Sequence, residues 1–484
     1  MRRAICLLAL ASGLSALTTL AQQPPAHPPS GKKAGTPSTE TAAKPPAILA
    51  STPPMGWNSW DSYGLTINEA DYKANVKWLR EHIAIYGWRY VVIDEGWYLK
   101  NPASGGKPAW DYTISDSGLY LPAVNRFPSA AGSPGFKPLA DWVHSLGLRF
   151  GLHIIHGIPR QAVEKNLPVA GTKFHAEDAA DKSDTCRWNP DNYGVKANEA
   201  GQAYYDSMAA LYAKWGLDFL KVDCITTPFK NDEIRMLSEA IKKTGRPIVL
   251  SLSPGPTPIE QIDDLRKYAQ MWRISDDFWD SWKKEKPEEG FPQSLQGQFA
   301  VAAKWSSQVQ TGHWPDADML PIGHLGPVPG WGPVRDSRLT HDEQRTLITL
   351  WSMLQSPLVI GANLTQVDDW TTSLLTNAEV ITVDQHAQGS HPVMQTDKTV
   401  IWTAGSRGGG TYVAVFNISD EPQNIQQSWQ ELGLAAGVYR VRDLWEHASV
   451  GIQTQLSVQL PAHASVLYRV AEAAPSQSGP APSQ

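Results

Sequence analysis

Apolar residues recur along this chain in short blocks, and a segment with helical spacing follows most of the blocks. Each block is rich in Val, Ile, Leu, Phe, Trp or Met, as expected of strands buried on both faces. The gaps carry apolar residues three and four positions apart, which indicates amphipathic helices. The predicted strands cover 55–60, 89–94, 149–154, 218–223, 247–253, 271–276, 314–320 and 357–363. The predicted helices include 68–85, 140–146, 201–215, 232–244, 295–308 and 341–353.

Eight alternating β and α units predict an α/β fold of the (β/α)8 TIM barrel type, for which about 250 residues and more are usual. After Asp384 the pattern changes to short alternating runs that are typical of antiparallel strands. We therefore predict a catalytic barrel over 51–388 and a C-terminal antiparallel β-sandwich over 389–471. The expected strands of the sandwich are 399–402, 412–418, 437–443, 456–460 and 465–470.

The two ends of the chain lack these patterns. Residues 1–21 begin with Arg2 and Arg3, continue as an apolar run and end in small residues near Ala21, as a cleavable signal peptide does. Residues 22–50 are rich in Pro, Ala, Ser and Thr, which predicts a disordered linker, and 472–484 have the same character. We expect a secreted or periplasmic protein.

Charge and composition limit the classes of binding partner that are expected. The 42 Lys and Arg against 48 Asp and Glu give a net charge of −6 without a basic block, so nucleic acid is not an expected partner. Beyond the signal, no stretch approaches the roughly 18 apolar residues of a membrane span. Twenty Trp favour a carbohydrate partner, because sugar rings stack on aromatic faces, although most of these Trp are expected in the core. The sequence does not set the oligomeric state.

Polar residues stand where the predicted barrel strands end. Lys221 and Asp223 lie two positions apart, hence on one face of a strand whose faces are normally buried. Barrel enzymes place their chemistry at this end of the strands. A structural role at a strand end explains one or two such residues, whereas seven strands with polar ends favour a site. The other candidates are Asn58, Trp60, Asp94, Glu95, His153, Ser251, Ser253, Arg273, Asp276, Asp277, Asp316 and Asp318.

Neither a cofactor nor a metal is expected from the sequence. It has no phosphate-binding Gly-rich loop, no calcium loop and no zinc spacing. His153 and His156 share one strand, but two ligands do not complete a metal site, and a sugar contact or a structural role is favoured for them. Outside the signal, Cys186 and Cys224 form either one disulfide beside Asp223 or two free thiols.

Carboxylates and aromatics at one mouth are typical of glycosidic bond cleavage. That reaction uses one carboxylate as the nucleophile and a second carboxyl group as acid and then base. Asp223 is the candidate nucleophile, kept ionised by neighbouring Lys221. Asp277 is the candidate acid and base, and adjacent Asp276 is expected to raise the pKa of one of the pair.

Five stretches, taken together, resemble glycoside hydrolase family 27, which includes α-galactosidases and α-N-acetylgalactosaminidases. The resemblance implies a retaining mechanism with Asp223 as nucleophile and Asp277 as acid and base. It also implies sugar contacts from Trp60, Asp94, Glu95, Lys221, Arg273 and Asp318, and Met319 is counted with the binding candidates. The stretches are Pro-Met-Gly-Trp-Asn-Ser-Trp at 54–60, Ile-Asp-Glu-Gly-Trp at 93–97, Lys-Val-Asp at 221–223, Trp-Arg through Asp-Asp at 272–277 and Trp-Pro-Asp-Ala-Asp-Met-Leu at 314–320.

The chain departs from the family pattern at several positions. The family usually has two adjacent Asp where this chain has Asp94 and Glu95, and the longer Glu95 reaches toward the space of a galactose hydroxymethyl group. β-L-Arabinopyranose lacks that group, and the family includes enzymes for it. Ser253 replaces a bulky acid of many α-galactosidases, which either admits an N-acetyl group or only caps a turn. His153 takes the place of a usual Tyr.

A long loop over 157–192 contains Cys186 and either narrows the site to terminal residues or adds subsites. The first functional hypothesis is a secreted retaining α-galactosidase. The alternatives are a β-L-arabinopyranosidase, because of Glu95, an α-N-acetylgalactosaminidase, because of Ser253, and a carbohydrate-binding protein without catalysis.

Overall fold

The computed structural model describes residues 48–102, 110–132, 135–326 and 332–473. The predicted signal peptide, nearly all of the predicted linker and the tail from 474 onward lie outside this part of the chain. Of the residues assigned to the linker, 48–50 are described, and Leu49 and Ala50 pack against a small apolar cluster that residues of the barrel strands form. Ala50 also accepts a hydrogen bond from Trp314 Nε1 (2.8 Å).

Eight parallel strands form the barrel sheet in the order β10-β9-β8-β7-β3-β2-β1-β13. A parallel bridge between Leu320 and Ile360 joins the segment after β10 to β13, which brings the two ends of the sheet together. Each of the eight predicted strands is present, which confirms the predicted class. The strands are β1 (Met55–Asn58), β2 (Tyr90–Ile93), β3 (Arg149–Ile155), β7 (Phe219–Asp223), β8 (Val249–Leu252), β9 (Met271–Arg273), β10 (Trp314–Asp316) and β13 (Leu358–Ile360).

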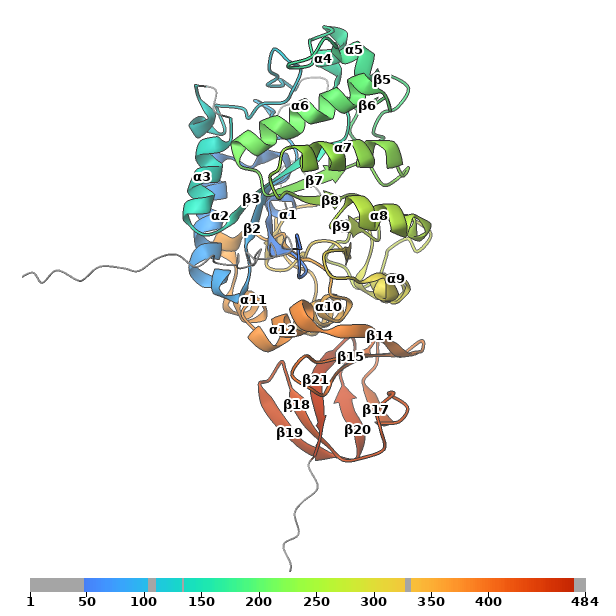
Figure 1. Ribbon diagram of the computed structural model, residues 1–484. Helices are drawn as coiled ribbons and strands as arrows, with labels where there is room; N and C mark the ends of the chain where they lie inside the picture. The colour runs from blue at the N-terminus through green and yellow to red at the C-terminus, as the bar shows by residue number, and fades with distance from the viewer. Residues whose placement is uncertain (1–47, 103–109, 133–134, 327–331, 474–484) are drawn as a thin grey trace, which may run out of the picture. The chain divides into compact units, whose positions relative to one another are not determined.

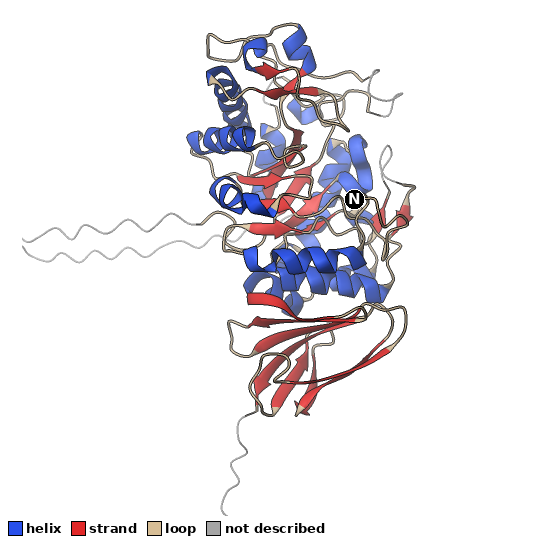
Figure 2. Cartoon of the chain, turned by 90° about the vertical axis from the view of Figure 1, so that its right-hand side faces the viewer, coloured by secondary structure: helices blue, strands red, loops and turns tan. Residues whose placement is uncertain are grey.

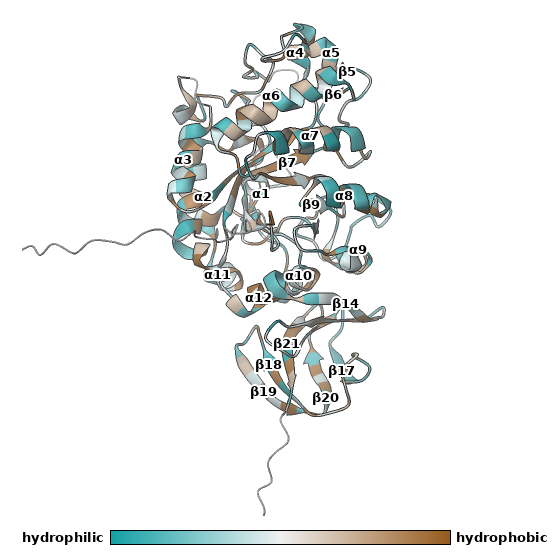
Figure 3. Cartoon of the chain, in the orientation of Figure 1, coloured by the Kyte–Doolittle hydropathy of each residue, from teal (hydrophilic) through white to brown (hydrophobic). Residues whose placement is uncertain are grey.

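Helices cover the outside of this sheet (Figure 1), and α7 and α8 are largely hydrophilic where strand β7 is hydrophobic (Figure 3). Their ends follow local sequence signals: Asn198 caps α6, which stops at Gly216 in the left-handed region (φ +90°). Thr340 and Glu343 form a capping box at the start of α10. The main helices are α2 (Glu69–His82), α3 (Lys137–Ser145), α6 (Glu199–Trp215), α7 (Asn231–Lys243), α8 (Ile262–Tyr268), α9 (Leu295–Trp305) and α10 (His341–Leu354). None of the described helices is long and apolar enough to cross a membrane.

The long segment after β3 is folded. It contains α4 (Arg160–Glu164) and α5 (Ala176–Ala179), and its three short strands pair in the antiparallel order β4-β6-β5. The strands are β4 (Ile158–Pro159), β5 (Ala180–Asp181) and β6 (Asn192–Val195). The disulfide alternative is confirmed, because Cys186 and Cys224 are bonded with their Cα atoms 5.8 Å apart. The bond fixes this segment to the loop that follows β7.

The C-terminal part consists almost only of strands, as Figure 2 shows. A six-stranded antiparallel sheet, in the order β14-β15-β16-β21-β18-β19, is accompanied by the pair β17-β20, and the core between them contains Val413, Val415, Trp429, Leu456 and Val470. The predicted sandwich is confirmed. Its strands are β14 (Gln388–Gln395), β15 (Thr399–Gly405), β16 (Thr411–Asn417), β17 (Gln423–Ser428), β18 (Tyr439–Asp443), β19 (Ala448–Gln453), β20 (Gln455–Leu460) and β21 (Ser465–Glu472).

Candidate active site

Polar side chains from β1, β2, β3 and β7 meet at the carboxyl end of the barrel around Asp94. Its Oδ2 accepts hydrogen bonds from Asn58 Nδ2 (2.7 Å) and Lys221 Nζ (3.0 Å). His153 Nε2 lies 3.9 Å from Asp94 Oδ1. Burial alone would raise the pKa of Asp94, but the charges of His153 and Lys221 outweigh it and hold that pKa well below its usual value. The mouth therefore has a fixed carboxylate beside a fixed ammonium group.

Asp223 lies at the end of β7, next to this cluster. His153 Nε2 is 3.3 Å from Asp223 Oδ2, and the backbone N–H of Cys224 donates to Oδ1. Burial raises the pKa of Asp223, but the His153 contact and the Lys221 charge exceed that effect and lower it. Cys224 itself has φ +61°, a backbone conformation that residues with a side chain rarely adopt. The geometry keeps the Asp223 carboxylate ionised.

Arg273, from β9, organises the opposite side of the mouth. Its Nη2 contacts Asp318 Oδ2 (2.6 Å) and Asp277 Oδ1 (3.0 Å). Burial, followed by the charges of Asp277 and Asp316, raises the pKa of Asp318 to about 7 although Arg273 opposes the shift. Asp318 has φ +88°, a strained conformation of the kind found at functional sites. One guanidinium thus holds two carboxyl groups, from the segments that follow β9 and β10.

The adjacent Asp276 and Asp277 differ in their surroundings. Partial burial and the charge of Asp277 raise the pKa of Asp276. The prediction that one of the pair has a raised pKa is therefore confirmed for Asp276. The side chain of Asp277 is 44% exposed and carries the Arg273 contact, so it is the one that opens to the mouth.

Glu95 is almost fully buried directly after Asp94. Asn189 Nδ2 donates to Glu95 Oε1 at 2.6 Å, and Asn189 Oδ1 accepts from the backbone N–H of Asp191. The segment between β3 and α6 therefore fixes the side chain that departs from the family pattern. Asn189 was not among the sequence candidates, because nothing in its local pattern distinguishes it from other loop residues.

The other predicted residues lie in the segments that follow the barrel strands. Trp60 is half-buried at the start of α1 (Trp60–Tyr63), and half-buried Met319 donates its backbone N–H to Asp318. Ser253 is buried after β8, with its backbone bonded to Val222 and Ile225. His156 Nδ1 lies 3.1 Å from buried Glu233, which agrees with the structural alternative given for this residue rather than with a sugar contact.

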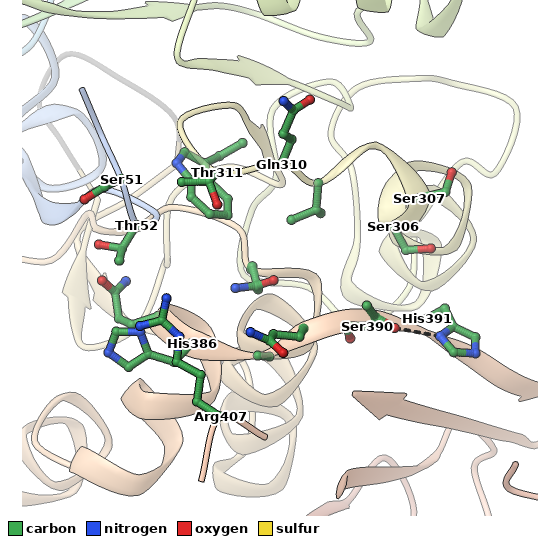
Figure 4. A pocket seen from close by; sticks show the side chains of 17 residues that line it. Ser51, Thr52, Ser306, Ser307, Gln310, Thr311, His386, Ser390, His391 and Arg407 are labelled. Atoms are coloured by element: carbon green, nitrogen blue, oxygen red, sulfur yellow. Dashed lines mark hydrogen bonds between the residues drawn. The ribbon is translucent and has the colours of Figure 1, made fainter. Parts of the chain in front are cut away.

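A separate hollow of about 610 Å³ lies near the start of β10 and the residues before β1 (Figure 4). His386, His391 and Arg407 line it together with several Ser, Thr and Gln side chains. It contains no Asp or Glu, so it cannot supply the two carboxyl groups that glycosidic cleavage requires. The strand-end mouth remains the candidate for chemistry.

Comparisons with known proteins identify relatives of both parts of the chain. A family model described as alpha galactosidase A matches residues 191–386, and one described as the alpha galactosidase C-terminal beta sandwich domain matches 396–470. A curated alpha-galactosidase of Cyamopsis tetragonoloba is 28% identical over 87% of this chain and 86% of its own length.

Two solved structures are more similar in sequence. A GH27 β-L-arabinopyranosidase from Geobacillus stearothermophilus is 44% identical, with a TM-score of 0.83 over 89% of this chain and 98% of that one. A candidate α-N-acetylgalactosaminidase from Bacillus halodurans is 38% identical, with a TM-score of 0.77 over 87% of this chain and 98% of that one.

Proposed function

This chain belongs to glycoside hydrolase family 27, and we propose that it hydrolyses terminal β-L-arabinopyranosides first and α-D-galactosides second. The two sugars share their ring stereochemistry and differ in the hydroxymethyl group, which only galactose carries. The preference of the enzyme therefore depends on whether the site has room for the hydroxymethyl group of galactose. The single observation that carries the order is the buried, hydrogen-bonded Glu95.

The proposed chemistry uses Asp223 and Asp277. Asp223 attacks the anomeric carbon while the glycosidic C–O bond breaks, and Asp277 gives its proton to the leaving oxygen. Water then attacks the glycosyl-aspartate, Asp277 takes the proton of that water, and Asp223 leaves as a carboxylate with net retention. Support comes from the ionised state of Asp223, the open position of Asp277 and the family membership.

Glu95 supports the pentose as the first substrate. It is one methylene longer than the Asp usual in the family, and Asn189 holds its carboxylate in place. A methylene in a specificity pocket is worth about 1 to 3 kcal/mol, or roughly 10- to 200-fold in rate. The 44% identity to a β-L-arabinopyranosidase, against 28% to an α-galactosidase, points the same way and reverses the order that sequence alone favours.

Ser253 keeps α-N-acetylgalactosaminides as a further candidate, because a small residue at this place leaves room for an N-acetyl group. The 38% identity to the Bacillus halodurans protein favours including that sugar in the comparison.

The test compares kcat/KM on aryl β-L-arabinopyranoside, aryl α-D-galactoside and aryl α-N-acetylgalactosaminide, for the wild type and for Glu95→Asp. We expect Glu95→Asp to raise the galactoside-to-arabinoside ratio about 10- to 200-fold. Glu199→Asp, at an exposed position of α6, is the matched control and leaves the ratio unchanged. A wild type that prefers galactoside, with an unchanged ratio in Glu95→Asp, contradicts the assignment of Glu95.

We further propose that the enzyme is exported. The support is the signal-like sequence of residues 1–21 and the Cys186–Cys224 disulfide, which is typical of oxidising compartments.

A further inference from the structure

Three potential metal ligands that the proposed chemistry does not use converge beside the loop that follows the nucleophile strand. His156 follows β3, Asp184 lies between β5 and β6, and Glu233 is in the first turn of α7. One ligand atom from each lies within 4.8 Å of the other two. His156 and Glu233 are buried, and the Asp184 side chain is 28% exposed, which leaves a path for an ion.

We propose that His156, Asp184 and Glu233 bind one divalent transition-metal cation of the zinc class in a structural role. One imidazole nitrogen with two carboxylates is a ligand set that suits such ions. His156 Nδ1 lies 3.1 and 3.2 Å from the two Glu233 oxygens. Two ligand atoms bound to one zinc ion at about 2.0 to 2.1 Å stand roughly 3 Å apart, so this spacing needs little adjustment.

The charges around the cluster are consistent with a cation. Lys230 Nζ contacts both Asp184 oxygens at 2.6 Å and balances one of the two carboxylates. The Glu233 carboxylate accepts a hydrogen bond from the Tyr205 hydroxyl and contacts the His156 imidazole. Burying a carboxylate costs free energy unless a positive charge compensates it.

The surroundings indicate what the ion would do. Tyr205 donates to Glu233 and accepts from the backbone N–H of Gly157, which orients the ligand from outside, as groups around metal sites commonly do. The backbone N–H of His156 donates to the carbonyl oxygen of Asp223 (3.1 Å). The metal, through Asp184, and the disulfide, through Cys186, would therefore anchor the segment between β3 and α6 beside the nucleophile.

The experiment uses the full chain without an affinity tag, treated with EDTA, dialysed and titrated with zinc chloride by calorimetry. We expect one zinc ion per chain, and a rise in Tm on adding zinc. Asp184→Asn should weaken binding by more than the roughly 10- to 100-fold typical of losing an outer partner, because it removes a ligand. Lys230→Met keeps all three ligands, removes the competing ammonium group and should bind zinc more tightly than the wild type.

Glu177→Gln, in the same segment and exposed, is the matched control and should bind as the wild type does. Absence of stoichiometric zinc in both the wild type and Lys230→Met overturns the proposal. Equal zinc affinity in the wild type and Asp184→Asn overturns it as well, because binding would then lie elsewhere.

Discussion

Asp223 is a buried carboxylate that its neighbours keep ionised, which is what a nucleophile requires. Asp223→Asn preserves the shape and the hydrogen bond from Cys224 while removing the attacking oxygen anion. We expect kcat to fall on the order of 10⁴-fold or more, since loss of a covalent nucleophile has effects of this size. Initial rates on the preferred aryl glycoside measure it, with a melting curve to show that the fold is intact.

Added azide tests directly whether the Asp223→Asn variant has lost the nucleophile. An external anion can take the place of the missing carboxylate and form a glycosyl azide of inverted configuration. Asp232→Asn, at an exposed position of α7, should keep wild-type rates. If Asp223→Asn retains more than a tenth of the wild-type rate, another residue is the nucleophile.

Asp318 makes stability depend on pH in a defined direction. Its pKa is raised to about 7 in the fold, so the folded state holds a proton that the unfolded chain releases above about pH 4. Stability from this group is full below pH 4 and falls as pH rises through 7, by about 1.4 kcal/mol for each pKa unit. Asp318→Asn removes this titration, so its unfolding free energy relative to the wild type should rise from pH 4 to 7.

Urea unfolding at several pH values measures this difference, and the slope is the readout, because effects of the substitution that do not depend on pH shift the whole curve without changing its slope. Asp116→Asn, at an exposed position, should follow the wild type. Parallel curves for the wild type and Asp318→Asn would mean that Asp318 is already ionised at pH 4.

At the scale of elements, the barrel could be predicted because buried parallel strands carry dense apolar blocks, and because their ends expose polar residues such as Lys221 and Asp223. Strands β14, β17 and β19 could not be predicted, because the sequence of a half-exposed strand such as Gln423–Ser428 has the polar composition of a loop. Asn189 could not either, since its place on Glu95 depends on a contact 94 residues apart along the chain. The ends of the predicted strands were therefore enough to find the candidate site residues. Finding Asn189, which orients Glu95, required the tertiary structure.

The disulfide ties the segment that carries Asn189 to the end of β7. The Cys186–Cys224 bond closes 38 residues, for which the chain-entropy model gives up to about 4 kcal/mol. Cys186→Ser should lower Tm and reduce the discrimination between arabinoside and galactoside, because Asn189 is three residues from the lost anchor. Melting curves and the kcat/KM ratio measure both. A reducing agent should lower the Tm of the wild type but not that of Cys186→Ser. An unchanged kcat/KM ratio in Cys186→Ser would mean that Asn189 keeps its position without the disulfide.

At the scale of the whole molecule, barrel and sandwich share one apolar core. Leu444, Trp445 and Leu467 of the sandwich belong to the same buried cluster as Leu347 and Trp351 of α10. Trp445 Nε1 also donates to Thr349 Oγ1 at 2.9 Å. The two parts should therefore unfold together in one transition rather than in two.

Asn377 tests this cooperativity. Its Nδ2 donates to the carbonyl oxygen of Leu444 (2.9 Å), and its Oδ1 caps α12 (Ala378–His386). Asn377→Ala leaves that carbonyl unsatisfied and removes the cap, at a cost of about 2 to 4 kcal/mol, or roughly 2 to 4 °C in Tm for a chain of this size. Calorimetry should show one transition shifted as a whole, with kcat unchanged and Asn424→Ala on exposed β17 as the control. Two separated transitions would instead mean that the sandwich holds its fold independently of the barrel.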